Sequence, residues 1–200
     1  MFIGIRKIMK NLLKKFLYET NGIAAIEVAF IMPFMFFLYF GLFDLTGLIS
    51  VNRKVTYSAS VVADLVAQNK TSVLKSDILN YFKASDMVMA PMPRTAIRVE
   101  VFGYRISGTT ISQVWKTDNA SGSSCGSPPS TGAMAPLMVA GNDLVVARVC
   151  TTYTPYIVTF LGKEILGKSS FVVGENITQR PRSTLKLTCY SSVVGGAVCS

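Results

Sequence analysis

The sequence contains no histidine, one tryptophan and four cysteines among its 200 residues. The absence of histidine removes the commonest general base and the commonest neutral metal ligand. The chain also lacks the GxSxG, HExxH and Walker motifs and the glycine pattern that binds dinucleotides. We therefore expect no cofactor and no metal site, and the sequence argues against an enzyme.

Long hydrophobic runs are also scarce, with one exception. Half of the residues are hydrophobic and the mean hydropathy is +0.42. The excess is concentrated in residues 23–49, where only Glu27 and Asp44 carry charge. As a helix this segment extends about 40 Å, which exceeds the roughly 30 Å of a bilayer's hydrocarbon core. We expect one transmembrane helix over residues 23–50.

The charges that flank this helix predict its orientation. Five basic residues precede Gly22 against a single acid, a net charge of +4, whereas only Arg53 and Lys54 follow closely. The positive-inside rule then places the N-terminus in the cytoplasm and the later residues outside. We expect residues 1–22 to be a basic cytoplasmic leader. Its amphipathic pattern suits a helix that lies on the inner leaflet. The alternative is that its positive charge only sets the topology. Residues 51–200 form the outer domain.

All four cysteines follow the apolar helix, and none belongs to a CxxC motif. An even number on the outer side is typical of disulfides formed in an oxidising compartment. Three pairings can be drawn, and short loops favour Cys125 with Cys150 and Cys189 with Cys199. Free buried thiols are the alternative.

The charges of the outer domain indicate a solvated surface. Residues 51–200 contain 15 basic and 8 acidic residues. These charges are scattered along the chain and are not interleaved with aromatic residues. This distribution argues against nucleic-acid binding.

Hydrophobic periodicity predicts an α+β fold in which one long helix packs on a small, mainly antiparallel sheet. The apolar helix continues through residues 51–70, with Val51, Val55, Ala59, Val62, Leu65 and Val66 on one face. A second helix is expected over residues 72–86, with Val73, Leu74, Ile78, Leu79 and Phe82 as its apolar face. Strands are expected at 95–106, 110–117, 143–155, 169–179 and 184–190. The stretch 144–162 is expected to be a strand followed by a loop, and residues 119–136 a loop fixed by Cys125.

The carboxylate at the start of the apolar helix needs an explanation, because acids are rare in membrane spans. Glu27 lies five residues after Gly22, between a basic leader and an apolar helix that contains Pro33. This is the arrangement of type IV prepilin-like signals, in which the chain is cut after the glycine. The α-amino group of Ile23 would then be free to pair with Glu27 of a neighbouring subunit, which fixes the axial register of a filament. Pro33 would kink or loosen the helix.

The stretch "GIAAIEVAFIMPFMFFLYFGLFDL" resembles the N-terminal signature of TadE-like proteins, the minor pilins or pseudopilins of the tight-adherence (Tad, Flp) pilus system. The matching residues are Gly22, Ala24, Ala25, Ile26, Glu27, Ala29, Pro33, Gly41 and Asp44. Val28 departs from the pattern: the family usually has Phe there, and Tad prepilin substrates prefer Tyr. Because of this departure, the alternative is a membrane anchor that the peptidase does not cut and that keeps its leader.

The resemblance implies a protein of the bacterial inner membrane, cut between Gly22 and Ile23, with its C-terminal domain in the periplasm. Implied partners are the prepilin peptidase, the major pilin, other Tad minor pilins and the ATPase-driven assembly and secretion platform. Its role would be pilus assembly for adhesion.

Two other interpretations stay open. One is an uncleaved, signal-anchored periplasmic binding or structural protein. The other is a membrane-tethered hydrolase that pairs a serine with a lysine, for which only Lys163 and Lys168 lie near a Ser/Gly-rich turn.

Overall fold

The computed structural model describes residues 22–70, 72–137, 139, 141–161, 170–182 and 186–189. Residues 1–21 of the basic leader, Lys163, Lys168 and Cys199 lie outside the described residues. The chain divides into two compact units, Met1–Leu45 and Thr46–Ser200. The division falls within one continuous helix, α2 (Gly22–Ala67).

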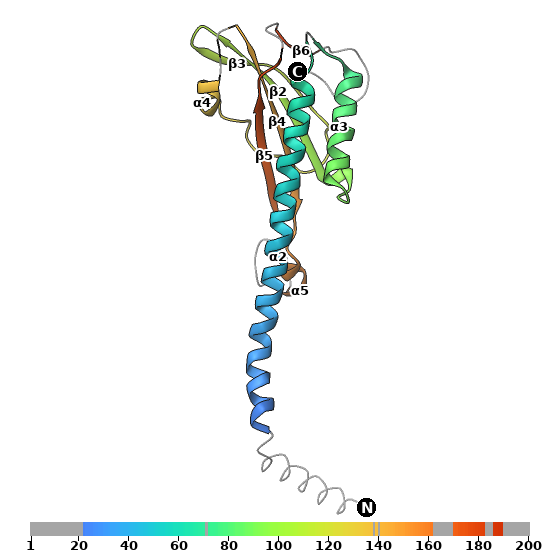
Figure 1. Ribbon diagram of the computed structural model, residues 1–200, viewed down its shortest axis with the longest axis vertical. Coiled ribbons are helices and arrows are strands. Elements are labelled where there is room, and N and C mark those ends of the chain that lie inside the picture. Colours follow the sequence, from blue (N-terminus) through green and yellow to red (C-terminus); the bar gives the residue numbers. More distant parts are fainter. Residues whose placement is uncertain are drawn as a thin grey trace, which may run out of the picture. The chain divides into compact units, whose positions relative to one another are not determined.

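The second unit is an α+β domain, so the predicted fold class is confirmed (Figure 1). Its sheet has four antiparallel strands in the order β3-β2-β4-β5. The strands are β2 (Ile97–Ser107), β3 (Thr110–Asp118), β4 (Asp143–Tyr153) and β5 (Phe171–Gln179).

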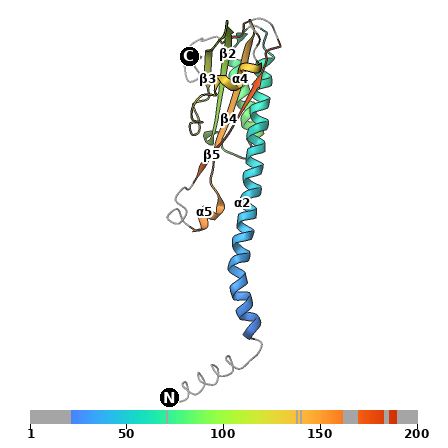
Figure 2. The same cartoon turned by 90° about the vertical axis from the view of Figure 1, so that its left-hand side faces the viewer.

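The C-terminal part of α2 runs along one face of this sheet (Figure 2). Every third or fourth residue of α2 is apolar, so one stripe of the helix meets the sheet. The predicted stripe is confirmed except at Leu65, which is half-buried, and Ala63 is buried in addition. The stripe and the sheet share one core, to which α2 contributes Val51, Val55, Ala59, Val62, Ala63 and Val66, and the sheet Ile97, Val99, Val101, Val145, Ala147 and Val149.

The second helix, α3 (Lys75–Met89), begins three residues later than predicted and continues three residues further. Its start is fixed by Asp77, whose carboxylate accepts the backbone N–H of Leu74 at 3.4 Å. Leu74 precedes the helix and is exposed, so it does not belong to the predicted apolar face. The residues that α3 buries are Ile78, Phe82, Ser85 and Met89.

Small residues allow α3 to approach α2 closely. The hydroxyls of Ser58 on α2 and Ser85 on α3 are 2.7 Å apart and fully buried, so each satisfies the other. At the end of α2, the Asn69 side-chain amide donates to the Val66 carbonyl at 3.1 Å and to the Tyr81 hydroxyl at 2.9 Å. Asn69 thus satisfies a helix-terminal carbonyl and ties the two helices together.

The β2–β3 hairpin contains a β-bulge that changes which side chains are buried. Gly103 pairs with Trp115, but Tyr104 pairs with Gln113, so Val114 is the extra residue. Val114 is exposed, and Trp115 turns into the core. The indole of Trp115 lies directly against Gly103, where a Cβ atom would overlap it.

The opposite face of the sheet is covered by the chain between β3 and β4. This stretch is the predicted loop, with two short additions, α4 (Thr131–Met134) and η2 (Ala135–Leu137). Met134 packs against Phe102, Tyr104, Leu144 and Val146 in a second, smaller core. The predicted disulfide between Cys125 and Cys150 is present, with 5.8 Å between the Cα atoms, and fixes the loop to β4.

Two expectations for the C-terminal part were wrong. The loop expected after β4 contains a short helix, α5 (Tyr156–Leu161). Within the described part of the expected strand at 184–190, only β6 (Thr188–Cys189) is a strand, and it pairs in parallel with β1 (Ser72–Val73) rather than with the main sheet. Two-residue pairings between distant segments have no periodic signal from which they can be predicted.

Candidate functional site

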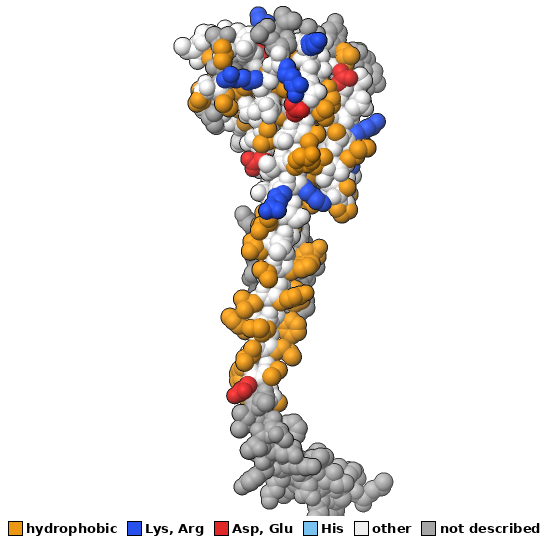
Figure 3. Space-filling model, viewed as in Figure 1, with side chains coloured by type: hydrophobic (Ala, Val, Ile, Leu, Met, Phe, Trp, Pro, Cys, Tyr) orange, Lys and Arg blue, Asp and Glu red, His pale blue; other side chains and the backbone are white. Residues whose placement is uncertain are grey.

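The first candidate is the apolar part of α2 in the first unit. Apart from Phe40, the described side chains from Ala25 to Phe43 are all exposed. Figure 3 shows the apolar side chains on the face of the helix in view. Phe30, for example, is 80% exposed. The 21 residues from Ala25 to Leu45 extend about 31 Å, because an α-helix rises about 1.5 Å per residue. By length and composition this helix can cross a membrane, and it is the one such helix among the described residues.

Glu27 is the one charged residue among the exposed apolar side chains at the start of this segment. Its side chain is exposed, and it has no hydrogen-bond or ion-pair partner among the described residues. Glu27 lies beyond the first turn of α2, which contains no acid, so the helix dipole favours its charge only weakly. Within the described part of the chain this acid is therefore unpaired, which leaves it available to a partner elsewhere.

The other predicted residues of this segment lie on the same helix. Gly22 is the first residue of α2, and Ile23 follows within it. Pro33 lies inside α2, which continues through it as helix. Proline has no N–H, so residue 33 donates no hydrogen bond to the Ala29 carbonyl. The effects of Pro33 on helix shape, of Gly22 on cleavage and of Glu27 on assembly stay predictions.

The second candidate is a cluster of charged side chains on the sheet face that the β3–β4 loop covers. Glu100 lies at its centre and is only 4% exposed. Three cations surround its carboxylate: Arg98 Nε at 3.2 Å, Lys116 Nζ at 3.5 Å and Arg148 Nη1 at 3.7 Å. The scattered charges of the outer domain predicted a solvated surface, and for Glu100 and Arg148, which are buried, that prediction was wrong.

Each charged side chain of the cluster has a partner within the fold, which favours a structural role. Arg98 also contacts Asp118 at 3.2 Å, and Arg148 Nη1 donates to the Ser127 carbonyl of the covering loop at 2.6 Å. Lys116 Nζ lies 5.4 Å from the centre of the Phe102 ring. Because strands alternate their faces, residues 98 and 100 of β2 and residue 148 of β4 reach the same side of the sheet. That alternation was the signal that could have grouped them.

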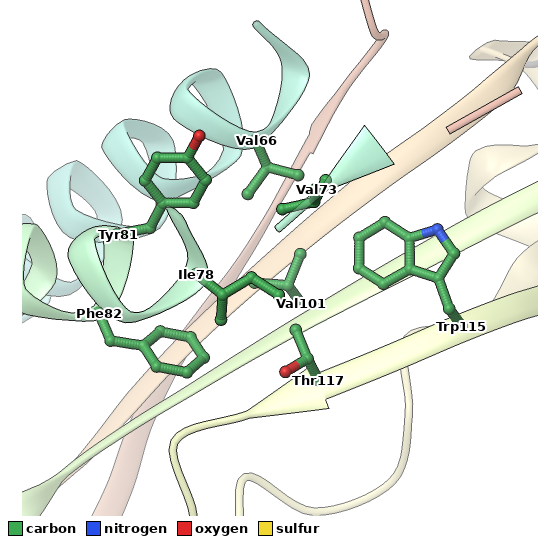
Figure 4. Close-up of a pocket in the computed structure, with 8 residues that line it drawn as sticks. All are labelled: Val66, Val73, Ile78, Tyr81, Phe82, Val101, Trp115 and Thr117. Carbon is green, nitrogen blue, oxygen red and sulfur yellow. The ribbon is translucent and has the colours of Figure 1, made fainter. Parts of the chain in front are cut away.

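A hollow lies between the helices and the sheet. Figure 4 shows its lining, in which side chains from α2, β1, α3, β2 and β3 converge: Val66, Val73, Ile78, Tyr81, Phe82, Val101, Trp115 and Thr117. These side chains leave no internal space for even one water molecule. The hollow is therefore part of the core and not a ligand site.

The described residues contain no group of three or more His, Cys, Asp or Glu side chains that could hold a metal ion. Cys189 is disulfide-bonded, and its predicted partner, Cys199, lies outside the described residues. The structure thus points to the apolar segment of α2 as the main candidate, since nearly all of its described side chains are exposed.

Comparison with known protein families bears on this same segment. Residues 22–64 match the sequence model of a family described as TadE-like protein. Over these residues the chain is similar to TadE-like proteins. The comparisons with curated proteins and with solved structures gave no match.

The TadE-like segment begins at Gly22, the first residue of α2, and ends three residues before α2 does. It therefore includes Glu27, Pro33 and most of the buried stripe that holds α2 on the sheet. The resemblance expected from the sequence is confirmed, and it extends beyond the 25 or so residues that carried it there.

Proposed function

We propose that this chain is a minor pilin or pseudopilin that takes part in assembling a Tad-type (type IVb) pilus for adhesion. The observation that carries the proposal is the TadE-like segment, which combines an exposed apolar helix with a carboxylate that has no partner in the described chain. An apolar helix surface of this length suits first a bilayer and then the helices of neighbouring subunits.

The chain would cross the inner membrane once, with its N-terminus in the cytoplasm and its C-terminal domain in the periplasm. The basic leader supports this orientation. The disulfide between Cys125 and Cys150 supports it independently, because structural disulfides are typical of the periplasm and rare in the cytosol.

A prepilin peptidase would cut the chain between Gly22 and Ile23. The new α-amino group of Ile23 would pair with Glu27 of an adjacent subunit once the helices pack side by side. A carboxylate in an apolar environment is stabilised strongly when it gains an opposite charge. The ion pair would therefore set the axial position of one subunit against the next.

The other partners proposed are the major pilin, further Tad minor pilins and the assembly platform. The chain would act through these contacts and not as a catalyst. An uncleaved, signal-anchored periplasmic protein is the second candidate, and Val28 favours it, because the family usually has Phe at this position.

The N-terminal residue of the mature protein tests the proposal. We expect intact mass and Edman sequencing of the membrane-extracted chain to give Ile23 as the first residue. Gly22→Ala should block the cut, whereas Glu27→Ala should leave the chain anchored but impair assembly. A chain that still begins at Met1 in a host with an active prepilin peptidase would contradict processing and favour the uncleaved anchor.

A further inference from the structure

Tyr153, the last residue of β4, contacts α2 at Gly47 within the second unit. A Cβ atom on Gly47 would lie 2.7 Å from the Tyr153 hydroxyl oxygen, so only glycine allows this approach. Tyr153 is just 8% exposed. The end of β4 is therefore fixed against the helix at Gly47.

The position of Gly47 along α2 gives its depth relative to a bilayer. This step rests on the proposed function, in which the apolar part of α2 spans the membrane. Gly47 follows Glu27 by 20 residues, which is about 30 Å of helix and equals the thickness of a hydrocarbon core. With Glu27 near one surface of the core, Gly47 lies at the other. Tyr153 is then at the outer lipid–water boundary.

Aromatic and apolar residues gather where β4 ends, β5 begins and α5 starts. Tyr153 pairs with Phe171 across β4 and β5, and their ring centres are 5.5 Å apart. Tyr156, at the start of α5, is 56% exposed, and Phe171 and Val172 are 42% and 47% exposed. We call Tyr153, Tyr156, Phe171 and Val172 the aromatic end. In both ribbon views α5 lies beyond the end of the sheet, away from β6 (Figures 1 and 2).

The chemistry of the aromatic end suits the interface of a membrane. No charged residue occurs from Val149 to Leu161 or from Ser170 to Gly174. Tyrosine has an apolar ring and a polar tip, and it is enriched where hydrocarbon meets headgroups. The exposed Arg53 lies six residues beyond Gly47 on α2, about 9 Å further out, at the level of lipid phosphates.

We propose that the aromatic end is a second membrane contact, which inserts Tyr156, Phe171 and Val172 into the outer boundary of the bilayer. The occupant of this surface is lipid. A transmembrane helix alone lets the attached domain tilt and rotate, whereas a second contact holds it in one orientation. The domain would then present the same face to its assembly partners in every copy.

Tryptophan fluorescence of the full chain in vesicles tests this contact. The protein is reconstituted in phosphatidylethanolamine–phosphatidylglycerol vesicles, with or without phospholipids brominated near the glycerol end of their acyl chains. Tyr156→Trp is the reporter and Phe171→Trp a second one. Leu137→Trp is the matched control, because Leu137 is 45% exposed in η2. Wild type supplies the background of the buried Trp115.

We expect brominated lipid to quench the added tryptophan of both reporters several-fold more than that of the control. Aqueous iodide should show the reverse order. Reporters that iodide quenches and brominated lipid does not would overturn the inference, and so would reporters shielded from both, since another protein copy would then cover the surface. Release of wild type from vesicles by alkaline carbonate would instead contradict the proposed anchor, and the inference with it.

Discussion

Arg105 and Asp143 face each other across the β2–β4 pair and form two parallel hydrogen bonds of 2.6 and 2.7 Å. The same carboxylate accepts the backbone N–H of Leu187 at 2.7 Å. Trp115 donates its indole N–H to the Leu187 carbonyl at 3.0 Å. Two side chains of the sheet thus satisfy both backbone groups of the buried residue that precedes β6.

Asp143→Asn should therefore destabilise the protein. The substitution removes the negative charge that faces Arg105, whose pKa is raised chiefly by its hydrogen bond to Asp143. It also leaves one oxygen acceptor in place of the two carboxylate oxygens that accept hydrogen bonds. We expect a loss of about 2–4 kcal/mol in the free energy of unfolding, measured by urea denaturation of the full chain in detergent. Asp64→Asn is the control: its ion pair with Arg182 is largely exposed, so the loss should stay below about 1 kcal/mol.

Gly103→Ala should displace Trp115. The added methyl group occupies space that the indole fills, so the ring must move and its hydrogen bond to Leu187 breaks. We expect a cost of about 1–3 kcal/mol and a red shift in emission, which reports only Trp115 because the chain has one tryptophan. Gly132→Ala, where a Cβ meets nothing within 4 Å, should leave the emission unchanged. An unshifted spectrum for Gly103→Ala would contradict the packing.

The disulfide between Cys125 and Cys150 should hold the β3–β4 loop over the charged cluster around Glu100. It closes a loop of 25 residues, for which chain entropy alone gives about 3.5 kcal/mol. Cys125→Ser with Cys150→Ala should lower the free energy of unfolding by about this amount. Hydrogen exchange should rise in residues 119–137 and stay unchanged in α3. Equal increases in both would show that the disulfide supports the whole domain and not this loop.

Stability should also depend on the ionisation of Asp86. Burial raises the pKa of this carboxyl above its ordinary value of 3.8, and Arg94, 3.3 Å away, opposes the rise only in part. The folded state therefore binds the proton more tightly than the unfolded state, so stability falls as the pH rises from 3.8 through the folded pKa. Asp86→Asn should remove this slope from unfolding midpoints measured across that interval. Arg94→Gln removes the charge that lowers the folded pKa of Asp86, so the pH interval over which stability falls should extend to higher pH. A narrower pH interval in this variant would contradict the assignment of burial and Arg94 as the opposing causes.

Local patterns in the sequence predicted most of the fold. The stripe from Val51 to Val66 has helical spacing, and the strands around Val99 and Val149 show their β-branched residues directly. These signals were sufficient because each element buries one face against a single core. The prepilin-like arrangement of Gly22 and Glu27 was equally local, and the TadE-like match covers it.

The remaining features depend on contacts between distant residues. The bulge at Val114 follows from the space that Gly103 leaves for Trp115, and no alternation within β3 shows this. The cluster of Arg98, Glu100 and Arg148 forms only when β2 and β4 pair, so its members look scattered along the chain. Burial by the loop after β3, which a disulfide fixes, then makes these charges part of the interior.

Glu27→Gln should separate the anchoring role of α2 from the proposed assembly role. The amide keeps the shape of the side chain but cannot pair as an anion with the Ile23 amine of a neighbour. We expect the variant to stay in the membrane and to be cut after Gly22, because the apolar segment and the cleavage residues are intact. Its association with other pilus subunits should weaken by about tenfold or more, since a charge-assisted hydrogen bond contributes about 1.5–3 kcal/mol. Co-purification after crosslinking measures this. Wild-type yields of crosslinked partner for Glu27→Gln would mean that the carboxylate only favours the start of the helix.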